Sequence, residues 1–338
     1  MNIGIIGAGG WGTALSILMA RKGFRVDLWS RDPEVVAEIL EERTNQAFLP
    51  GVAIPRGVHP TLEMQEVIRN NSLLLLPVPS QHLREVARAA RPYITPRHVI
   101  VHCSKGIETE TLLRMSQVLE EELPSCQGGR ILVLSGPSHA EEVARGIPTA
   151  IVVAGRDKAL CEAVQDMLMA PEFRVYISPD VIGVELGGAL KNIIALAAGI
   201  SDGLGFGDNT KAALMTRGIA EIARLGTKMG ADPLTFSGLA GIGDLIVTCT
   251  SVHSRNRRAG IEIGRGKPIS EVMASTKMVI EGIPTTLAGK RLADKYGVEM
   301  PITQKLYSVL FGGLNPKDAV TELMARGKKE EIPFPPGW

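Results

Sequence analysis

A glycine motif near the N-terminus follows an apolar run and opens a helical pattern. Ile3–Ile6 reads as a buried strand, and Gly7-Ala-Gly-Gly-Trp-Gly12 behind it satisfies G-x-G-x-x-G. In this motif Gly7 permits a tight turn, Gly9 lets the main chain approach a pyrophosphate, and Gly12 lets the helix pack on the strand. The free N–H groups of the first helical turn then face the phosphates. The chain is therefore predicted to begin with the strand–turn–helix unit of a dinucleotide-binding α/β domain.

Up to about residue 180, short apolar runs alternate with amphipathic stretches, a pattern typical of a parallel sheet with crossover helices. Further strands are expected at Phe24–Trp29, Leu73–Val78, Val99–Cys103, Ile131–Leu134, Thr149–Val153 and Phe173–Ile177. Helices are expected at Thr13–Arg21, Pro33–Glu42, Gln81–Ala90 and Thr109–Glu121, and Asn45–Pro60 is expected to be an irregular loop. Residues 1–180 are thus predicted to form a Rossmann-like, parallel-sheet domain that binds a dinucleotide.

After Ser178-Pro179-Asp180 the helical patterns follow one another with few β-branched runs between them. They cover Val184–Gly199, Lys211–Met229, Asn256–Ile263, Thr285–Lys295 and Thr303–Phe311. Residues 181–338 are therefore predicted to form a mostly α-helical domain for substrate binding and catalysis. The Pro-rich segment Ile332–Trp338 is expected to be a frayed tail, with Trp338 as the residue that would dock it.

Charge and cysteine usage exclude several classes of protein. The 338 residues carry 37 Lys and Arg against 36 Asp and Glu, so no overall field attracts nucleic acid or a membrane surface. The four cysteines form no Cys-x-x-Cys pair, and no metal site is predicted. Reduced thiols and an N-terminus that leads directly into a core strand favour a cytoplasmic protein. The apolar stretch Gly183–Ile200 contains Glu185, Lys191 and Asn192, which favours a buried helix over a membrane span.

The choice between NAD and NADP depends on the residues after the second strand. Asp32 stands about twenty positions past the glycine motif, where a carboxylate would bond the ribose hydroxyls of NAD. It precedes Pro33, however, and is better interpreted as a helix N-cap. Arg31 at the tip of the strand would accommodate a 2′-phosphate, which favours NADP(H) or use of both NADP(H) and NAD(H). The alternative is that Arg31 is a solvated surface charge.

Three further loops fall just after predicted strands, on the sheet edge where open α/β folds bind ligands. They are Pro77–Ser80, Ser104–Gly106 and Ser135–Ser138, and the second carries Lys105. Each loop alone is consistent with ordinary turn chemistry. Three loops on one edge favour a crevice.

Lys191 and Asn192 lie in the middle of a helical pattern that is apolar on nearly every side. A buried charge is costly unless it has a partner or a task, and burial lowers the pKa of a lysine towards neutrality. Gly187 and Gly188 one turn earlier indicate that space is needed there, which a substrate beside Lys191 would use. The alternative is a lysine whose stem is buried and whose ammonium reaches water.

A second group of polar residues follows a glycine-rich turn. Gly238–Asp244 ends on a carboxylate that would hold Lys191 or a hydroxyl, and Ser254-Arg255-Asn256 begins a positively charged helix suited to a phosphate or carboxylate. Arg257 and Arg258 are expected to be solvated. Glu281 is a weaker candidate for contact with a cofactor hydroxyl.

Together these motifs resemble the bacterial type of NAD(P)-dependent glycerol-3-phosphate dehydrogenases. They match in the family's order up to about Pro301, and the segments Gly187–Asn192 and Ser254–Arg258 are more specific than the glycine motif. The motifs that match are Gly7–Gly12, Val78–Ser80, Lys105–Glu108, Ser135–Ser138, Glu185–Gly199, Ser201–Gly203, Gly238–Thr250, Ser254–Arg258 and Val279–Gly282. One departure is His139, which stands where the family usually has phenylalanine.

The resemblance implies a role for each matching residue. Lys191 would be the proton donor and acceptor in the reversible reduction of dihydroxyacetone phosphate to sn-glycerol 3-phosphate. The substrate would be lined by Lys105, Gly136, Ser138, Lys191, Asp244, Ser254, Arg255 and Asn256. Besides the glycine motif, the cofactor would meet Gly10, Trp11, Arg31, Lys105, Ala140, Arg255, Val279 and Glu281. The family further implies a cytoplasmic homodimer that supplies phospholipid synthesis.

Two other functions remain as alternatives. A β-hydroxyacid dehydrogenase or ketopantoate-type reductase shares the two-domain scaffold and its lysine, and would prefer a carboxylate substrate. A dinucleotide-sensing protein without turnover would bind the cofactor whatever stands at Lys191 and Asp244. A polar pair inside an apolar helix favours catalysis over sensing.

Overall fold

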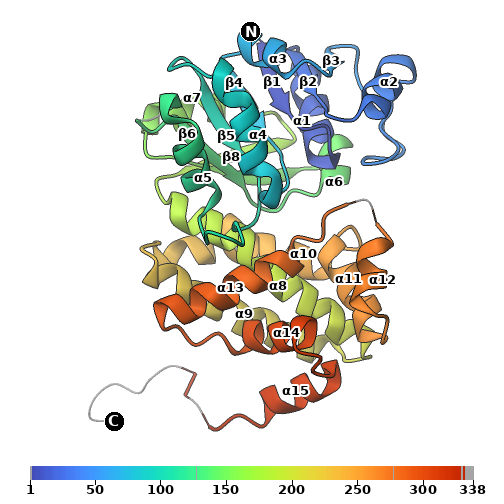
Figure 1. The fold of residues 1–338 in the computed structure, drawn as a ribbon, viewed down its shortest axis with the longest axis vertical. Coiled ribbons are helices and arrows are strands. Elements are labelled where there is room, and N and C mark those ends of the chain that lie inside the picture. The colour runs from blue at the N-terminus through green and yellow to red at the C-terminus, as the bar shows by residue number, and fades with distance from the viewer. Residues whose placement is uncertain (1, 127, 277, 329, 332–338) are drawn as a thin grey trace.

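The computed structural model describes residues 2–126, 128–276, 278–328 and 330–331 (Figure 1). A sheet flanked by helices forms one half of the molecule, and a group of helices forms the other. The predicted tail Ile332–Trp338 lies outside the described residues.

The sheet has eight strands in the order β3-β2-β1-β4-β5-β6-β7-β8. The strands are β1 Asn2–Ile6, β2 Arg25–Trp29, β3 Val58–Thr61, β4 Leu73–Leu76, β5 Val99–His102, β6 Ile131–Ser135, β7 Thr149–Ala154 and β8 Phe173–Ser178. The predicted runs therefore form strands, because their apolar residues are buried on both faces between helices. The strand order reverses between β1 and β4, which places a ligand crevice at their carboxyl ends.

The sheet is not wholly parallel. The prediction of a parallel sheet was wrong for one pair of strands. β7 pairs with β6 in the antiparallel sense, and β8 pairs with β7 in parallel. Residues 136–148 contain only the five-residue helix α6 Ala140–Ala144. This connection stays at the carboxyl end of β6, where Ser138–Glu141 line a cleft. The chain therefore re-enters the sheet from the end at which it left.

The other helices of the sheet domain are α1 Gly10–Arg21, α2 Pro33–Glu41, α3 Met64–Asn70, α4 Leu83–Ala90, α5 Met115–Glu122 and α7 Lys158–Leu168. Two sequence predictions were wrong here. Strand β3 takes the last residues of the expected loop Asn45–Pro60, where Val58 is buried against β2. The helix expected from Thr109 begins only at Met115, because Leu112 has a φ of +62° and cannot continue a right-handed helix.

The helical half is built around α8 Val181–Gly203, which is buried along most of its length. Its neighbours are α9 Asp208–Lys228, α10 Asp244–Thr250, α11 Arg255–Gly264, α12 Ile269–Ala274, α13 Gly282–Tyr296, α14 Pro301–Phe311 and α15 Pro316–Met324. α9, α10, α11, α13 and α14 pack against α8 and supply its apolar surroundings. By length and composition α8 could cross a membrane, but 89% of its most apolar window is buried inside the protein. It is the core helix of this half.

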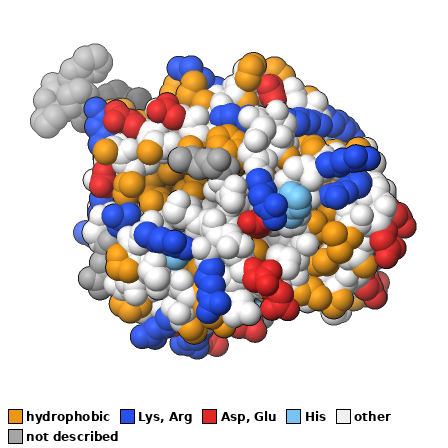
Figure 2. Space-filling model, turned by 90° about the horizontal axis from the view of Figure 1, so that it is seen from above, with side chains coloured by type: hydrophobic (Ala, Val, Ile, Leu, Met, Phe, Trp, Pro, Cys, Tyr) orange, Lys and Arg blue, Asp and Glu red, His pale blue; other side chains and the backbone are white. Residues whose placement is uncertain are grey.

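The surface carries no single sign of charge over the face that Figure 2 shows. Lysine and arginine side chains alternate there with aspartate and glutamate side chains. Over the whole sequence the formal net charge is +1.

Candidate active site

A cleft of about 420 Å³ lies where the carboxyl ends of β1, β4, β5 and β6 meet α8, α10 and the start of α11. The three predicted loops after β4, β5 and β6 all contribute to its wall. Of the predicted site residues, all but Gly12 and Gly136 line it; those that do are Gly7, Gly9, Gly10, Trp11, Arg31, Lys105, Ser138, Ala140, Lys191, Asp244, Ser254, Arg255, Asn256, Val279 and Glu281. The fold thus brings together residues that are far apart in the sequence.

The glycine motif forms an open cradle at the start of α1. Gly7 has a φ of +124°, and α1 begins without a side-chain cap, so its first N–H groups face the cleft. A Cβ on Gly9 would meet nothing within 4 Å, whereas one on Gly12 would lie 1.8 Å from the Gly7 carbonyl oxygen. Gly9 is therefore open to a ligand, and Gly12 lets α1 approach β1. The cradle fits the pyrophosphate of a dinucleotide.

Arg31 and Asp32 follow β2 at the outer end of the cleft. Asp32 accepts a hydrogen bond from the Glu34 N–H at 3.0 Å, with Pro33 at the first helical position, so the predicted N-cap is confirmed. Its carboxylate is thus committed to α2. Arg31 is exposed and lines the cleft, where its guanidinium is free to meet a phosphate.

Two lysines converge on Asp244 at the inner end of the cleft. Lys191 Nζ lies 2.5 Å from Asp244 Oδ1, and Lys105 Nζ lies 2.8 Å from Asp244 Oδ2. Lys191 also donates to Thr248 Oγ1 at 2.7 Å, and Lys105 donates to the Gly136 carbonyl at 2.8 Å. The expected contact between Asp244 and Lys191 is confirmed. The alternative, an ammonium reaching water, is wrong because the Lys191 side chain is only 6% exposed.

The surroundings set the charge states of this group. Burial lowers the pKa of Lys191 to about 7, although Asp244 acts in the opposite direction. For Asp244, burial opposes ionisation, but Lys105 and Lys191 outweigh it and hold the pKa below its usual value. Near neutral pH, Lys191 can therefore give up or accept a proton while Asp244 stays ionised.

The space around Gly187 and Gly188 is filled by protein, so the prediction that a substrate uses it was wrong. A Cβ on Gly187 would lie 2.4 Å from the Ala240 carbonyl oxygen, and one on Gly188 would lie 2.5 Å from Ser135 Oγ. The two glycines let the turn before Asp244 and the end of β6 approach α8. They act on the site by bringing Asp244 close to Lys191.

Asn192 and Asn256 join the lysine loop to the start of α11. Asn192 Nδ2 donates to the Lys105 carbonyl at 3.0 Å, and Asn256 Nδ2 donates to Asn192 Oδ1 at 2.8 Å. Asn256 Oδ1 accepts from the Gly282 N–H at 2.9 Å. The two amides hold the helical half against the Lys105 loop, and Asn256 keeps only part of its hydrogen-bonding capacity for a ligand.

The first turn of α11 brings hydrogen-bond donors that suit an anion to the cleft. Ser254 caps the helix by accepting from the Arg257 N–H at 3.2 Å, which leaves its own O–H free to donate. Arg255 is exposed and lines the cleft. Arg258 is exposed, as expected. The prediction for Arg257 was wrong, because its side chain is 18% exposed and pairs with Asp202 at 2.7 Å.

Glu281 links the two halves across the cleft. Its carboxylate accepts from the Ser80 N–H at 2.9 Å and from Ser80 Oγ at 2.5 Å. Burial raises the pKa of Glu281. A cofactor hydroxyl that meets this carboxylate would therefore share it with Ser80.

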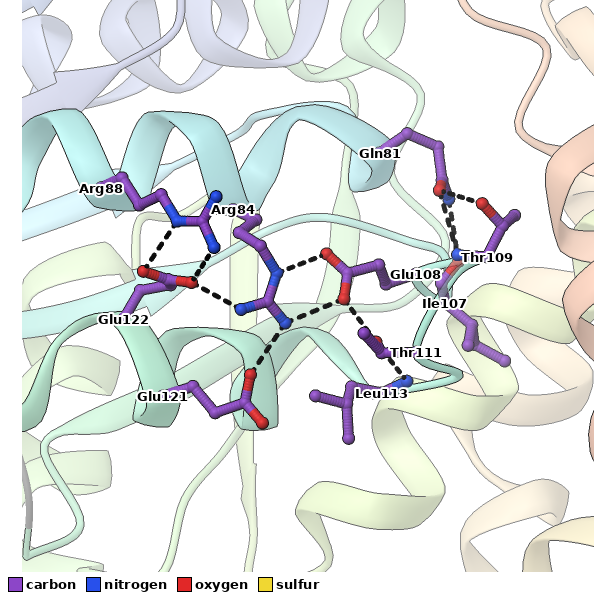
Figure 3. Close-up of polar contacts among 10 residues, drawn as sticks. All are labelled: Gln81, Arg84, Arg88, Ile107, Glu108, Thr109, Thr111, Leu113, Glu121 and Glu122. Atoms are coloured by element: carbon purple, nitrogen blue, oxygen red, sulfur yellow. Dashed lines mark hydrogen bonds and ion pairs between the residues drawn. The ribbon is translucent and has the colours of Figure 1, made fainter.

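The loop that carries Lys105 is anchored by the network in Figure 3. Arg84 on α4 contacts Glu108 at 2.7 Å, Glu121 at 2.8 Å and Glu122 at 2.5 Å. Gln81 donates to the Ile107 carbonyl at 2.8 Å and accepts from the Thr109 N–H at 3.1 Å. Glu108 thus fixes the chain that follows Lys105.

Sequence reasoning missed Thr248 and the Arg84 network. Thr248 lies four residues after Asp244 on α10, and this i, i+4 spacing would have placed both side chains on one face of a helix. No helix was expected there, so the signal went unused. The partners of Arg84 come from α5 and the loop before it. The sequence predicted the start of this helix at Thr109, whereas it begins at Met115.

The chain matches known proteins over most of its length. Residues 2–161 match the family described as NAD-dependent glycerol-3-phosphate dehydrogenase N-terminus, and residues 180–321 match the corresponding C-terminus. A protein of Pelotomaculum thermopropionicum named glycerol-3-phosphate dehydrogenase [NAD(P)+] is 56% identical over 331 residues, covering 98% of this chain and 95% of its own. One of Moorella thermoacetica with the same name is 53% identical, covering 98% of each chain.

A solved structure with the same architecture is the glycerol-3-phosphate dehydrogenase of Coxiella burnetii. It superposes with a TM-score of 0.92 at 39% sequence identity, covering 96% of this chain and 99% of its own. The two-part architecture is therefore that of a known enzyme fold.

Proposed function

The chain belongs to the NAD-dependent glycerol-3-phosphate dehydrogenase family, and we propose that it reduces dihydroxyacetone phosphate reversibly to sn-glycerol 3-phosphate with NADPH or NADH. The observation that carries this proposal is the contact of Lys105 with the buried Lys191–Asp244 pair, between the glycine cradle and the start of α11. It combines a dinucleotide site, an acid–base group and an anion site in one cleft.

The cofactor site is formed mainly by the sheet domain. The cradle at Gly7–Gly12 would hold the pyrophosphate, and Arg31 would favour a 2′-phosphate on the adenosine ribose. The cofactor would also meet the other predicted residues of this wall, which are Trp11, Lys105, Ala140, Arg255, Val279 and Glu281. When bound, the reduced nicotinamide supplies the hydride for the carbonyl carbon of the substrate.

Lys191 handles the proton. In the reducing direction its ammonium donates to the carbonyl oxygen as that oxygen becomes an alkoxide, and in the oxidising direction neutral Lys191 takes the proton from the alcohol. Asp244 and Thr248 hold Nζ in one position, because both contact it directly. Lys105 adds a second positive charge where negative charge develops.

The phosphate of the substrate binds at the start of α11. Arg255 offers a guanidinium fork, the Ser254 hydroxyl offers a donor, and the helix N-terminus adds a partial positive charge. Asn256 and Ser138 line the same cleft, and the Gly136 carbonyl accepts from Lys105 behind it. Binding the phosphate there orients the carbonyl towards Lys191.

In the cell, the reaction would supply glycerol 3-phosphate for phospholipid synthesis. The protein would act as a homodimer in the cytoplasm. The division at residue 180 would separate the cofactor domain from the catalytic one. Both statements rest on the family resemblance and on the change from sheet to helices between β8 and α8.

The direct test measures oxidation of the reduced cofactor by the purified protein with dihydroxyacetone phosphate, once with NADPH and once with NADH. We expect turnover with both cofactors and a lower NADPH-to-NADH ratio of kcat/KM in Arg31→Ala. A carboxylate ketone such as ketopantoate that outcompetes dihydroxyacetone phosphate would overturn the substrate assignment. Binding of both cofactors without turnover of any ketone would overturn the enzyme assignment.

A further inference from the structure

The Gln81 side chain bridges two residues of the loop that carries Lys105 (Figure 3). Its Nε2 donates to the Ile107 carbonyl at 2.8 Å, and its Oε1 accepts from the Thr109 N–H at 3.1 Å and from Thr109 Oγ1 at 3.0 Å. Both ends of the amide are therefore engaged with the chain just after Lys105. Gln81 does not line the cleft, so any effect that it has on the reaction passes through other residues.

The turn that carries Gln81 is itself fixed. Ser80 is 2% exposed, and it donates both its N–H and its Oγ to the Glu281 carboxylate of the helical half. Gln81 Nε2 also donates to Ser80 Oγ at 3.1 Å. A Cβ on Gly106 would lie 2.3 Å from Ser80 Oγ, so the loop after β5 packs directly on this turn. Gln81 is therefore a rigid support for the loop.

Lys105 depends on such a support more than Lys191 does. The Lys105 side chain is 20% exposed, whereas the Lys191 side chain is 6% exposed. A lysine side chain has many rotamers, so its ammonium stays at one carboxylate only where the backbone beneath it is fixed. Asn192 fixes the Lys105 carbonyl at 3.0 Å from the side of α8. Gln81 fixes the chain that follows from the side of the sheet domain.

We propose that Gln81 is a positioning residue for the reaction, because it holds the loop after β5 so that Lys105 keeps its positive charge beside Asp244 and Lys191. This proposal rests on the proposed function. The two lysines share one carboxylate, with Lys105 on Oδ2 and Lys191 on Oδ1. If the loop loosens and Lys105 moves away, Asp244 pairs with Lys191 alone.

This movement would change the acid strength of Lys191. Burial is the main cause of the lowered pKa of Lys191, and the positive charge of Lys105 lowers it further, against the charge of Asp244. The pKa of Lys191 should therefore rise when Lys105 leaves. The charged and titratable groups around Lys191 are Asp244 and Cys249 on α10, His139 after β6, and Lys105. Among them, Lys105 is the group on the loop that Gln81 holds.

The test measures the pH profile of kcat/KM for dihydroxyacetone phosphate, with NADPH saturating, in the wild type and in Gln81→Met. Methionine has a similar volume but cannot form the hydrogen bonds of the amide. We expect the pH at which kcat/KM has fallen by half to move upward by about 0.5 to 1 pH units, because a nearby like charge is removed. We also expect kcat to fall about 3- to 30-fold, because less positive charge meets the alkoxide. Arg84 still holds Glu108, so the variant is expected to fold.

A double-mutant cycle shows whether Gln81 acts through Lys105. Lys105→Met removes the charge itself, so adding Gln81→Met to it is expected to change neither the pH profile nor kcat any further. The matched control is Gln165→Met on α7, outside the cleft, where Gln165 Nε2 likewise donates to a backbone carbonyl, that of Val175, at 2.7 Å. This control is expected to leave the pH profile and kcat unchanged.

An unshifted pH profile in Gln81→Met would overturn the proposal. So would a shift of the same size with and without Lys105, since Gln81 would then act through another group. Gln81→Asn has a shorter amide and is expected to shift the profile in the same direction, and it takes the place of Gln81→Met if that variant does not fold. Failure of the wild type to reduce dihydroxyacetone phosphate would instead contradict the proposed function, so the two failures are distinguishable.

Discussion

At the scale of single residues, binding of the substrate phosphate is expected to depend on Arg255. Arg255→Ala removes the guanidinium at the start of α11, and hydrogen bonds to charged groups contribute about 1.5–3 kcal/mol. We therefore expect the KM for dihydroxyacetone phosphate to rise about 10- to 100-fold, with a smaller change in kcat. Arg258→Ala is the matched control, because Arg258 is exposed on the same helix and does not line the cleft. Equal KM values in the two variants would place the phosphate elsewhere.

The pH dependence of the reduction and of the reverse oxidation should follow the protonation state of Lys191. Burial lowers its pKa to about 7, so the ammonium needed for reduction is lost as the pH rises above this value. The kcat/KM for dihydroxyacetone phosphate should fall above about pH 7, and the kcat/KM for glycerol 3-phosphate should rise through the same range. Both profiles are measured with the cofactor saturating. Profiles that stay flat from pH 6 to pH 9 in both directions would assign the proton to another group.

The sequence predicted the contact between Lys191 and Asp244 but not the packing around it. A lysine inside an apolar helix needs a partner, and the carboxylate of Asp244 was found by the same reasoning. The mistakes at Gly187 and Arg257 share a cause, because both depend on which chain segment packs nearby. Ala240 fills the space beside Gly187, and Asp202 meets Arg257, and neither neighbour is visible in the local pattern.

At the scale of elements, Glu221 is a buried carboxylate that caps another helix. It is 1% exposed on α9 and accepts from the Ile302 N–H at 2.7 Å, in the first turn of α14. Burial raises its pKa to about 7, against the hydrogen bonds from Ile302 and Thr303. Between the unfolded pKa of about 4.5 and this value, the unfolded chain loses the proton that the folded chain keeps. Stability therefore falls as the pH rises through this window.

Glu221→Gln should remove this component of the pH dependence, which amounts to about 3 kcal/mol. The free energy of unfolding of the wild type, minus that of the variant, should be larger at pH 5 than at pH 8. Urea unfolding of both proteins at the two pH values measures it. A difference that does not change with pH would show that Glu221 does not titrate in this window.

Element boundaries were predicted well where the hydrophobic periodicity is strong and poorly where the conformation of a turn sets the boundary. The pattern Val184–Gly199 marks the middle of α8, whose observed ends lie three and four residues further out. The helix expected at Thr109 failed because Glu108 bonds to Arg84 and Leu112 adopts a positive φ. The reversed direction of β7 was not predictable either. Residues 136–148 have the length of a crossover, yet they stay at the carboxyl end of β6.

At the scale of the whole molecule, Glu185 joins α8, the helix that carries Lys191, to the sheet domain. Its carboxylate accepts from the Ser116 N–H at 2.6 Å in the first turn of α5, and it also pairs with Arg114. His102 Nε2 lies 3.1 Å away. Burial favours the neutral acid, but His102, Arg114 and Ser116 outweigh it and lower the pKa of Glu185 to about 2. The contribution to stability is therefore present above about pH 4.5 and is lost as the pH falls towards 2.

Glu185→Gln should destabilise the protein by about 3–5 kcal/mol at pH 7, because it leaves a buried arginine without its charge partner. The difference from the wild type should shrink as the pH falls from 5 to 3. Glu41→Gln on the exposed side of α2 is the matched control and should change stability by less than about 0.5 kcal/mol. A Glu185→Gln effect that stays constant down to pH 3 would contradict the pKa direction.

The two-part architecture was predicted from the change in pattern near Asp180, and the family resemblance was confirmed by the comparisons. What the sequence did not reveal is how the halves are joined. The links through Glu185, Asn192 and Glu281 pair residues that are many positions apart, and each depends on the final packing of α8 against the sheet. The cleft is therefore a property of the assembled molecule.

The central claim, that Lys191 transfers the proton in a dehydrogenase site, is tested most directly by the kcat of Lys191→Ala with dihydroxyacetone phosphate and NADPH. We predict a fall of about two to four powers of ten, the range for loss of an acid–base group, with the Kd for NADPH nearly unchanged. Turnover at the wild-type rate in a folded Lys191→Ala protein would contradict the claim.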